Sequence, residues 1–118
     1  MEAAPLNNDV AEGPPGGQAF WLTTSDGVRI RLAVWPEGEK GTVLIFPGRT
    51  EYAEKYGRAA AEYAARGFAT ISIDWRGQGI AERLLPDSRI GHVIRFRDYQ
   101  QDVAAVMEAV AALDLPRP

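Results

Sequence analysis

The sequence lacks cysteine altogether, which excludes disulfide bonds, thiolate chemistry and a disulfide-stapled secreted scaffold. It contains one histidine, and a single histidine with scattered carboxylates does not form a ligand set, so we expect no metal site. It also lacks a long hydrophobic run. The longest strongly apolar stretch, Val43 to Phe46, falls far short of the roughly 18 residues that a membrane-spanning helix needs, so no transmembrane segment is predicted.

An excess of charge of one sign is absent too. Thirteen basic and sixteen acidic residues give a net charge of −3, which offers no reason to expect nucleic acid or an anionic membrane as a partner. The N-terminus carries Glu2 and Asp9 without a basic cluster or an apolar core, so it does not resemble a secretory signal. By default, we expect a soluble, cytoplasmic protein. A hydrophobic content of 46% over 118 residues is ordinary for one globular domain.

The composition divides the chain into two parts. Residues 1–18 are rich in proline, glycine, asparagine and acidic residues and offer almost nothing to bury, so we expect a flexible tail. Residues 19–118 begin with two alternating runs, over 20–24 and 28–34, on either side of Ser25-Asp26-Gly27. This pattern predicts an antiparallel hairpin that is half buried on one face.

Later patterns predict an alternation of strands and helices. Continuous apolar runs indicate buried strands, and apolar residues at helical spacing indicate helices, in the order 42–46, 53–65, 68–73 and 97–113. Gly67 is expected to cap the first of these helices. A long irregular connection over 76–95 precedes the last helix. The order predicts an α/β fold in which an antiparallel hairpin leads into a parallel sheet with flanking helices.

Two of the predicted strands end in glycine-containing turns with charged residues, VLIFPGRTEY over 43–52 and TISIDWRGQG over 70–79. Such turns are where buried parallel strands present functional residues. Together with GHVIRFRDYQQDV over 91–103, they resemble, in order, motifs of the α/β-hydrolase family, in its bacterial lysophospholipase and monoacylglycerol-lipase-like branch. The resemblance covers residues 19–118. It implies a partial α/β-hydrolase domain that stops before the strand carrying the nucleophile.

The resemblance implies a serine hydrolase acting on carboxylic esters, of the lysophospholipid or monoacylglycerol type, through an acyl-enzyme and an oxyanion hole. The small-molecule ester or lipid substrate is the expected partner, and no cofactor is expected. Because the family's catalytic Ser, Asp and His are absent, we expect this chain alone to be inactive. The missing C-terminal half, or a partner chain, would be needed to cover the exposed sheet edge, without which the chain should be poorly soluble or molten. A non-catalytic short α/β protein that acts as a binding or assembly module is the alternative.

The first turn contains the residues that the resemblance assigns to catalysis and substrate binding. By position, the backbone N–H of Arg49 is an oxyanion-hole donor, and Gly48 lets the backbone approach the substrate closely. The alternative is an ordinary Pro-Gly turn. The Arg49 guanidinium could meet a substrate phosphate or carboxylate, pair with Glu51, or lie in water. Glu51 is expected to brace the loop backbone rather than to act as an acid or base. The family's histidine is replaced here by Pro47.

The second turn is expected to give structural support. Asp74 and Arg76 are expected to form a charged pair that organises the loop beneath the active site, with Gly77 and Gly79 supporting the same turn. A Gly-x-Gly after a strand also suggests dinucleotide binding. That motif needs a third glycine where this chain has Glu82, so the interpretation is not favoured.

His92 and the serines are weaker candidates. His92 precedes any plausible nucleophile elbow, so we expect it to brace a loop or lie exposed rather than act as a general base. Ser25, Ser72 and Ser88 all lie outside a Gly-x-Ser-x-Gly motif and are not expected to be nucleophiles.

Overall fold

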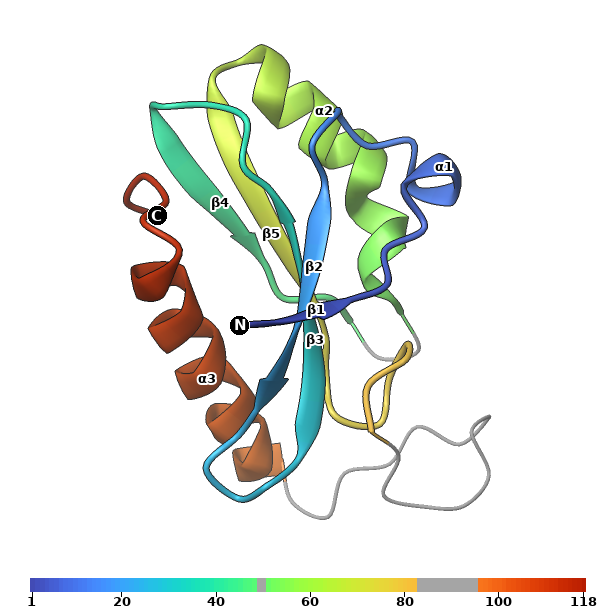
Figure 1. The fold of residues 1–118 in the computed structure, drawn as a ribbon, viewed down its shortest axis with the longest axis vertical. Coiled ribbons are helices and arrows are strands. Elements are labelled where there is room, and N and C mark those ends of the chain that lie inside the picture. The colour runs from blue at the N-terminus through green and yellow to red at the C-terminus, as the bar shows by residue number, and fades with distance from the viewer. Residues whose placement is uncertain (49–50, 83–95) are drawn as a thin grey trace.

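A five-stranded mixed sheet forms the centre of the computed structural model, which describes residues 1–48, 51–82 and 96–118 (Figure 1). The strands are β1 (Glu2–Ala4), β2 (Gln18–Thr23), β3 (Arg29–Trp35), β4 (Gly41–Ile45) and β5 (Phe68–Asp74). Across the sheet their order is β1-β2-β3-β5-β4. β4 and β5 are parallel, and the other neighbouring pairs are antiparallel. The predicted antiparallel hairpin leading into parallel strands is confirmed, but its expected burial on one face only is wrong for β3, in which residues 30–35 are all buried.

Helices cover both faces of the sheet. In chain order they are α1 (Asn8–Ala11), the 3-10 turn η1 (Ala53–Tyr56), α2 (Gly57–Ala65), the 3-10 turn η2 (Phe96–Asp98) and α3 (Tyr99–Ala112). The two helices that the periodicity predicts are thus confirmed, and each begins with a 3-10 turn. Gly67 follows α2 with a φ of +91°, a left-handed conformation that glycine adopts without strain, so its predicted capping position is confirmed as well.

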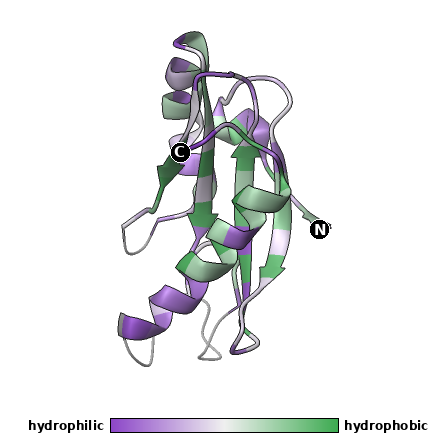
Figure 2. Cartoon of the chain, turned by 90° about the vertical axis from the view of Figure 1, so that its left-hand side faces the viewer, coloured by the Kyte–Doolittle hydropathy of each residue, from purple (hydrophilic) through white to green (hydrophobic). Residues whose placement is uncertain are grey.

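Side-chain alternation along β3 divides the core into two clusters. Ile30, Leu32 and Val34 pack in the cluster that includes α3, whereas Ala33 and Trp35 pack with residues of α1, η1 and α2. All five side chains are at most 2% exposed. Because the side chains of a strand point alternately to its two faces, β3 lies between two helical layers. Figure 2, viewed from the α3 side, shows this helix in front of the strands.

Residues 1–18, expected to be a flexible tail, include two elements of the structure. β1 pairs with β2, and α1 packs so that Ala11 is 3% exposed. The Oδ1 atom of Asn8 accepts a hydrogen bond from Trp35 Nε1 (3.0 Å), and a Cβ at Gly13 would lie only 2.4 Å from that nitrogen. More of this segment is packed than its composition indicates, while the domain boundary at residue 18 stays a prediction.

β4 lies at one edge of the described sheet. It pairs with β5 on one side; the backbone N–H of Thr42 donates to Arg117 O (3.0 Å) and its hydroxyl donates to Pro116 O (2.5 Å). The expectation that 42–46 is a buried strand is wrong for its later residues, which are half-buried or, at Phe46, 38% exposed. An edge strand has one neighbour fewer to cover its side chains.

Candidate functional site

The candidate residues lie together at one end of the sheet. The carboxyl ends of the parallel strands β4 and β5 are at this end. Because β3 runs antiparallel to β5, with Arg31 opposite Asp74, the β2–β3 turn lies there too (Figure 1). The described candidates at this end of the sheet are Gly48, Glu51, Asp74, Arg76, Gly77 and Gly79. Arg49 lies outside the described residues, and so do Ser88 and His92.

The Glu51 carboxylate closes the loop after β4. Its Oε1 atom accepts hydrogen bonds from the backbone N–H of Gly48 (2.5 Å) and from the Tyr56 hydroxyl (2.8 Å), and its Oε2 atom accepts one from Lys55 Nζ. The hydrogen bond from Lys55, followed by that from Tyr56, lowers the pKa of Glu51 to about 2. A carboxylate that stays ionised accepts hydrogen bonds and holds no proton to give, so this geometry supports the predicted bracing role.

A glycine at position 48 suits this arrangement. A Cβ there would lie 3.0 Å from Glu51 Oε1, tighter than most contacts of real Cβ atoms. The close approach of the carboxylate to the backbone therefore gives a structural reason for Gly48, beside the role expected from the resemblance.

Asp74 joins three segments at the end of β5. It is fully buried; its Oδ1 atom accepts a hydrogen bond from the backbone N–H of Ala53 (2.8 Å), and its Oδ2 atom accepts from Arg31 Nε and from the backbone N–H of Ile80 (2.9 Å). Gly79 has a φ of +50°, and a Cβ there would lie 2.2 Å from Asp74 Cγ. The turn after β5 can fold over the carboxylate only because position 79 has no side chain.

The expected pair between Asp74 and Arg76 is wrong. Asp74 bonds to Arg31, whereas Arg76 bonds to Asp26 and Asp102. β5 ends at Asp74 and the chain then turns, so the alternation that would place residues 74 and 76 on the same face no longer applies.

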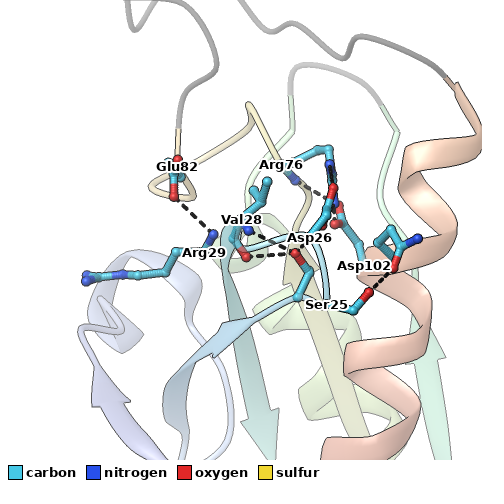
Figure 3. Close-up of polar contacts among 9 residues, drawn as sticks. Ser25, Asp26, Val28, Arg29, Arg76, Glu82 and Asp102 are labelled. Carbon is cyan, nitrogen blue, oxygen red and sulfur yellow. Dashed lines mark hydrogen bonds and ion pairs between the residues drawn. The ribbon is translucent and has the colours of Figure 1, made fainter.

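Arg76 is the centre of a second network (Figure 3). Its guanidinium is 2% exposed; it donates two hydrogen bonds to Asp26, of 2.8 and 2.9 Å, and its Nε donates to Asp102 Oδ1 (2.9 Å). The backbone N–H of Arg76 donates to Asp102 Oδ2 (3.0 Å). These bonds connect the β2–β3 turn, the turn after β5 and the first turns of α3. Gly77, with a φ of +77°, continues this turn.

The two carboxylates around Arg76 differ in their electrostatic environment. The hydrogen bond from Arg76, and then that from Thr24, holds the pKa of Asp26 far below its ordinary value. Burial raises the pKa of Asp102, and the hydrogen bonds from Arg76 oppose that shift. Asp102 therefore depends on Arg76 for its charge balance more than the partly exposed Asp26 does.

Arg31, Asp26 and Asp102 belong to these networks but were not predicted as site residues from the sequence motifs. Two signals in the sequence point to such residues. Arg31 stands within a run of buried strand residues, where a charge needs a partner. Asp102 lies four, seven and eight residues before Val106, Ala109 and Val110, on the apolar stripe of α3.

The remaining candidates have no catalytic arrangement in the described part of the chain. Ser25 Oγ donates to Gln101 Oε1 across to α3, and Ser72 is fully buried inside β5. Residues 1–48, 51–82 and 96–118 contain no group of three histidines, cysteines or acids placed to hold a metal ion. Within the same ranges, no helix has the length and apolar character that crossing a membrane requires.

An aromatic cluster lies beside the loop. The ring of Trp75 is 5.5 Å from that of Phe46 and 4.9 Å from that of Tyr99, measured between centroids. The indole Nε1 of Trp75 donates to Pro47 O (2.6 Å), which fixes the start of the loop to the residue after β5.

Comparison with known proteins identifies the protein family to which this chain belongs. The model of the serine aminopeptidase S33 family matches residues 37–117, and the chain belongs to this family of α/β-hydrolases. The resemblance found in the sequence is thereby confirmed. The structure of the Pyrococcus furiosus esterase Pf2001 matches 92% of this chain and 40% of that chain, with a TM-score of 0.67 and 17% identity, a level that shows likeness of fold alone.

Curated relatives narrow the comparison further. Lysophospholipase L2 of Escherichia coli (strain K12) is 49% identical over 63 residues, which are 53% of this chain and 18% of the relative. Probable lysophospholipase L2 of Haemophilus influenzae is 34% identical over 84 residues, which are 70% of this chain and 26% of the relative. The chain thus spans about a fifth to a quarter of the length of these relatives.

Proposed function

We propose that this chain is the N-terminal part of a serine hydrolase that cleaves carboxylic esters of the lysophospholipid or monoacylglycerol type. The observation that carries the proposal is the Pro-Gly loop at the carboxyl end of β4, braced by Glu51, in a chain 49% identical over 63 residues to a lysophospholipase. The substrate is a small-molecule ester or lipid, and the protein acts in the cytoplasm.

The first half of the oxyanion hole is the chemical contribution of this chain. Attack on an ester carbonyl places negative charge on its oxygen, which preorganised backbone N–H groups stabilise. The backbone N–H of Arg49 supplies one donor, Gly48 gives the substrate room, and Glu51 braces the loop. Asp74, Arg76, Gly77 and Gly79 support it from the neighbouring turn. The second donor and the nucleophile, acid and histidine come from outside this chain.

The edge of β4 that faces away from β5 is where the missing half joins. The hydrogen bonds of Thr42 with the carbonyls of Pro116 and Arg117 support this, because they bring the chain alongside that edge just after α3. Residues 19–118 are then a partial domain, and without the rest the covalent route to ester hydrolysis is closed.

Reading the coding DNA past codon 118 in all three frames is the first test. A further strand with Gly-x-Ser-x-Gly, followed by an Asp and a His, supports the proposal. A clean stop without such a continuation overturns it in favour of a binding or assembly module.

A fusion tests the chemistry directly. This chain is joined to the C-terminal part of the E. coli relative and assayed with lysophosphatidylcholine and monoacylglycerol. The fusion should hydrolyse at least one ester, while neither part does so alone. Gly48→Val should lower kcat at least roughly tenfold. The valine side chain would press against Glu51, and under this proposal it would occupy the space left for the substrate. Ala104→Val, on the exposed side of α3, is the matched control. A folded, monodisperse fusion without activity contradicts the proposal.

A further inference from the structure

Arg31, in the middle of β3, connects four segments of the chain although it belongs to none of the turn motifs. Its Nε donates to Asp74 Oδ2 (2.8 Å), its Nη1 and Nη2 donate to the two oxygens of Glu54 (2.7 and 2.5 Å), and its Nη1 also donates to Pro5 O (2.8 Å). Arg31 is 2% exposed, and the side chains of Glu54 and Asp74 are 11% and 0% exposed. Such a fork needs its partners in one plane, which fixes η1 relative to the end of β5.

The position of η1 relative to the end of β5 depends on the positive charge of the Arg31 guanidinium. Glu54 and Asp74 are carboxylates from different segments that bind one cation, and both side chains are largely or fully buried. Burial raises the pKa of Glu54, but hydrogen bonds from Arg31 and then from the backbone N–H of Asn7 outweigh it, so the pKa is lowered and the group stays ionised. Without Arg31, two like charges would face each other in a buried site and push the segments apart.

The loop that carries the candidate oxyanion donor ends at this network. Its start is held by the Trp75 indole on Pro47 O, and its far end by the backbone N–H of Ala53 on Asp74 Oδ1. Glu54, the next residue, is held by Arg31. A displacement of Asp74 or Glu54 therefore moves the end of the loop.

We propose that Arg31 is a positioning residue for this loop: by holding Asp74 and Glu54, it fixes Ala53 and so the end of the loop in the arrangement that ester hydrolysis needs. This inference rests on the proposed function and extends it to a residue outside the motifs. The N-terminal segment also takes part in this hydrogen-bond network, because Pro5 O accepts a hydrogen bond from the guanidinium and the backbone N–H of Asn7 donates one to Glu54.

The kinetic test uses the fusion described above. Arg31→Met should lower kcat about 10- to 100-fold with KM changed less than about threefold, because a small displacement of an oxyanion donor weakens binding of the transition state more than that of the ester. Arg31→Lys keeps the charge without the fork and should recover part of kcat. Arg29→Met, two residues away on β3 with its side chain over the Trp21 ring, is the matched control and should stay within about twofold. Each variant is assayed at a temperature at which near-UV circular dichroism shows it to be folded.

A folded Arg31→Met variant with unchanged kcat overturns the inference. If Arg31→Met does not fold, kcat is compared in Arg31→Lys and Glu54→Gln instead. A folded variant of either kind with unchanged kcat then overturns the inference. Hydrogen exchange of the peptide that contains Ala53 gives a readout independent of activity: exchange should quicken in Arg31→Met and not in Arg29→Met. If the unmutated fusion is inactive, the proposed function fails, while this exchange result still supports or overturns the role of Arg31.

Discussion

Replacing Arg76 by methionine should destabilise the protein by about 3–4 kcal/mol, because the change leaves Asp102 buried without its counter-charge. Asp102 is fully buried, and removing one partner of a buried pair costs about 3–5 kcal/mol. The backbone N–H of Arg76 still donates to Asp102, which places the cost near the lower end of that range. The lost bonds to Asp26, whose side chain is 39% exposed, add roughly 0.5 kcal/mol.

A double-mutant cycle separates this cost from lost packing. Asp102→Asn removes the buried charge, so combining it with Arg76→Met should cost less than the sum of the two single changes by about 2 kcal/mol. Urea unfolding of the fusion, followed by near-UV circular dichroism, gives the midpoints. Arg58→Met, in an exposed pair with Glu12, is the control and should leave the midpoint unchanged. A loss below about 1 kcal/mol for Arg76→Met, or strict additivity, would refute the reasoning.

Three further predictions concern Gly79, Glu51 and the isolated chain. Gly79→Ala should cost about 2 kcal/mol or more in a thermal melt, because it combines a left-handed φ with a clash against Asp74, whereas Gly16→Ala, with a φ of +84° and open space, bears only the conformational part; equal losses would contradict this. Glu51 has a pKa of about 2, below its ordinary value of 4.5, so its stabilising contribution is complete above about pH 4.5 and is lost as the pH falls toward 2. Glu51→Gln should flatten the stability–pH curve over that window, and an unchanged curve would exclude the effect. The isolated chain should be poorly soluble or molten, because the apolar strand β4 lies at the edge of the described sheet; a sharp, cooperative melt of a monomer would count against this.

Local pattern accounts for most of the elements. The hairpin, both long helices and the cap at Gly67 follow from periodicity and turn chemistry, which depend on neighbours within a few residues. The turns that contain Gly48 and Gly79 can also be recognised as motifs, because a side chain at either position would lie too close to a neighbouring carboxylate. The two turns lie at the same end of the sheet because β4 and β5 are parallel.

The partners of the charged residues could not be predicted in the same way. Arg31 meets Asp74 and Arg76 meets Asp102 across 43 and 26 residues of sequence, and these pairings are fixed only once the strand order is known. The placement of β5 between β3 and β4 decides them. A sequence shows that a buried arginine needs a carboxylate, but not which one.

The strand order has a consequence for synthesis on the ribosome. β3 and β4 are completed before β5, yet β5 is the strand that fills the space between them. At roughly 5–20 residues per second, the roughly 30 residues from the end of β4 to the end of β5 take about 1.5–6 s to make. During that interval the nascent hairpin and β4 both have open backbone edges. Chaperone capture of nascent chains, resolved by length, should therefore peak after β4 has emerged and fall once β5 has left the exit tunnel.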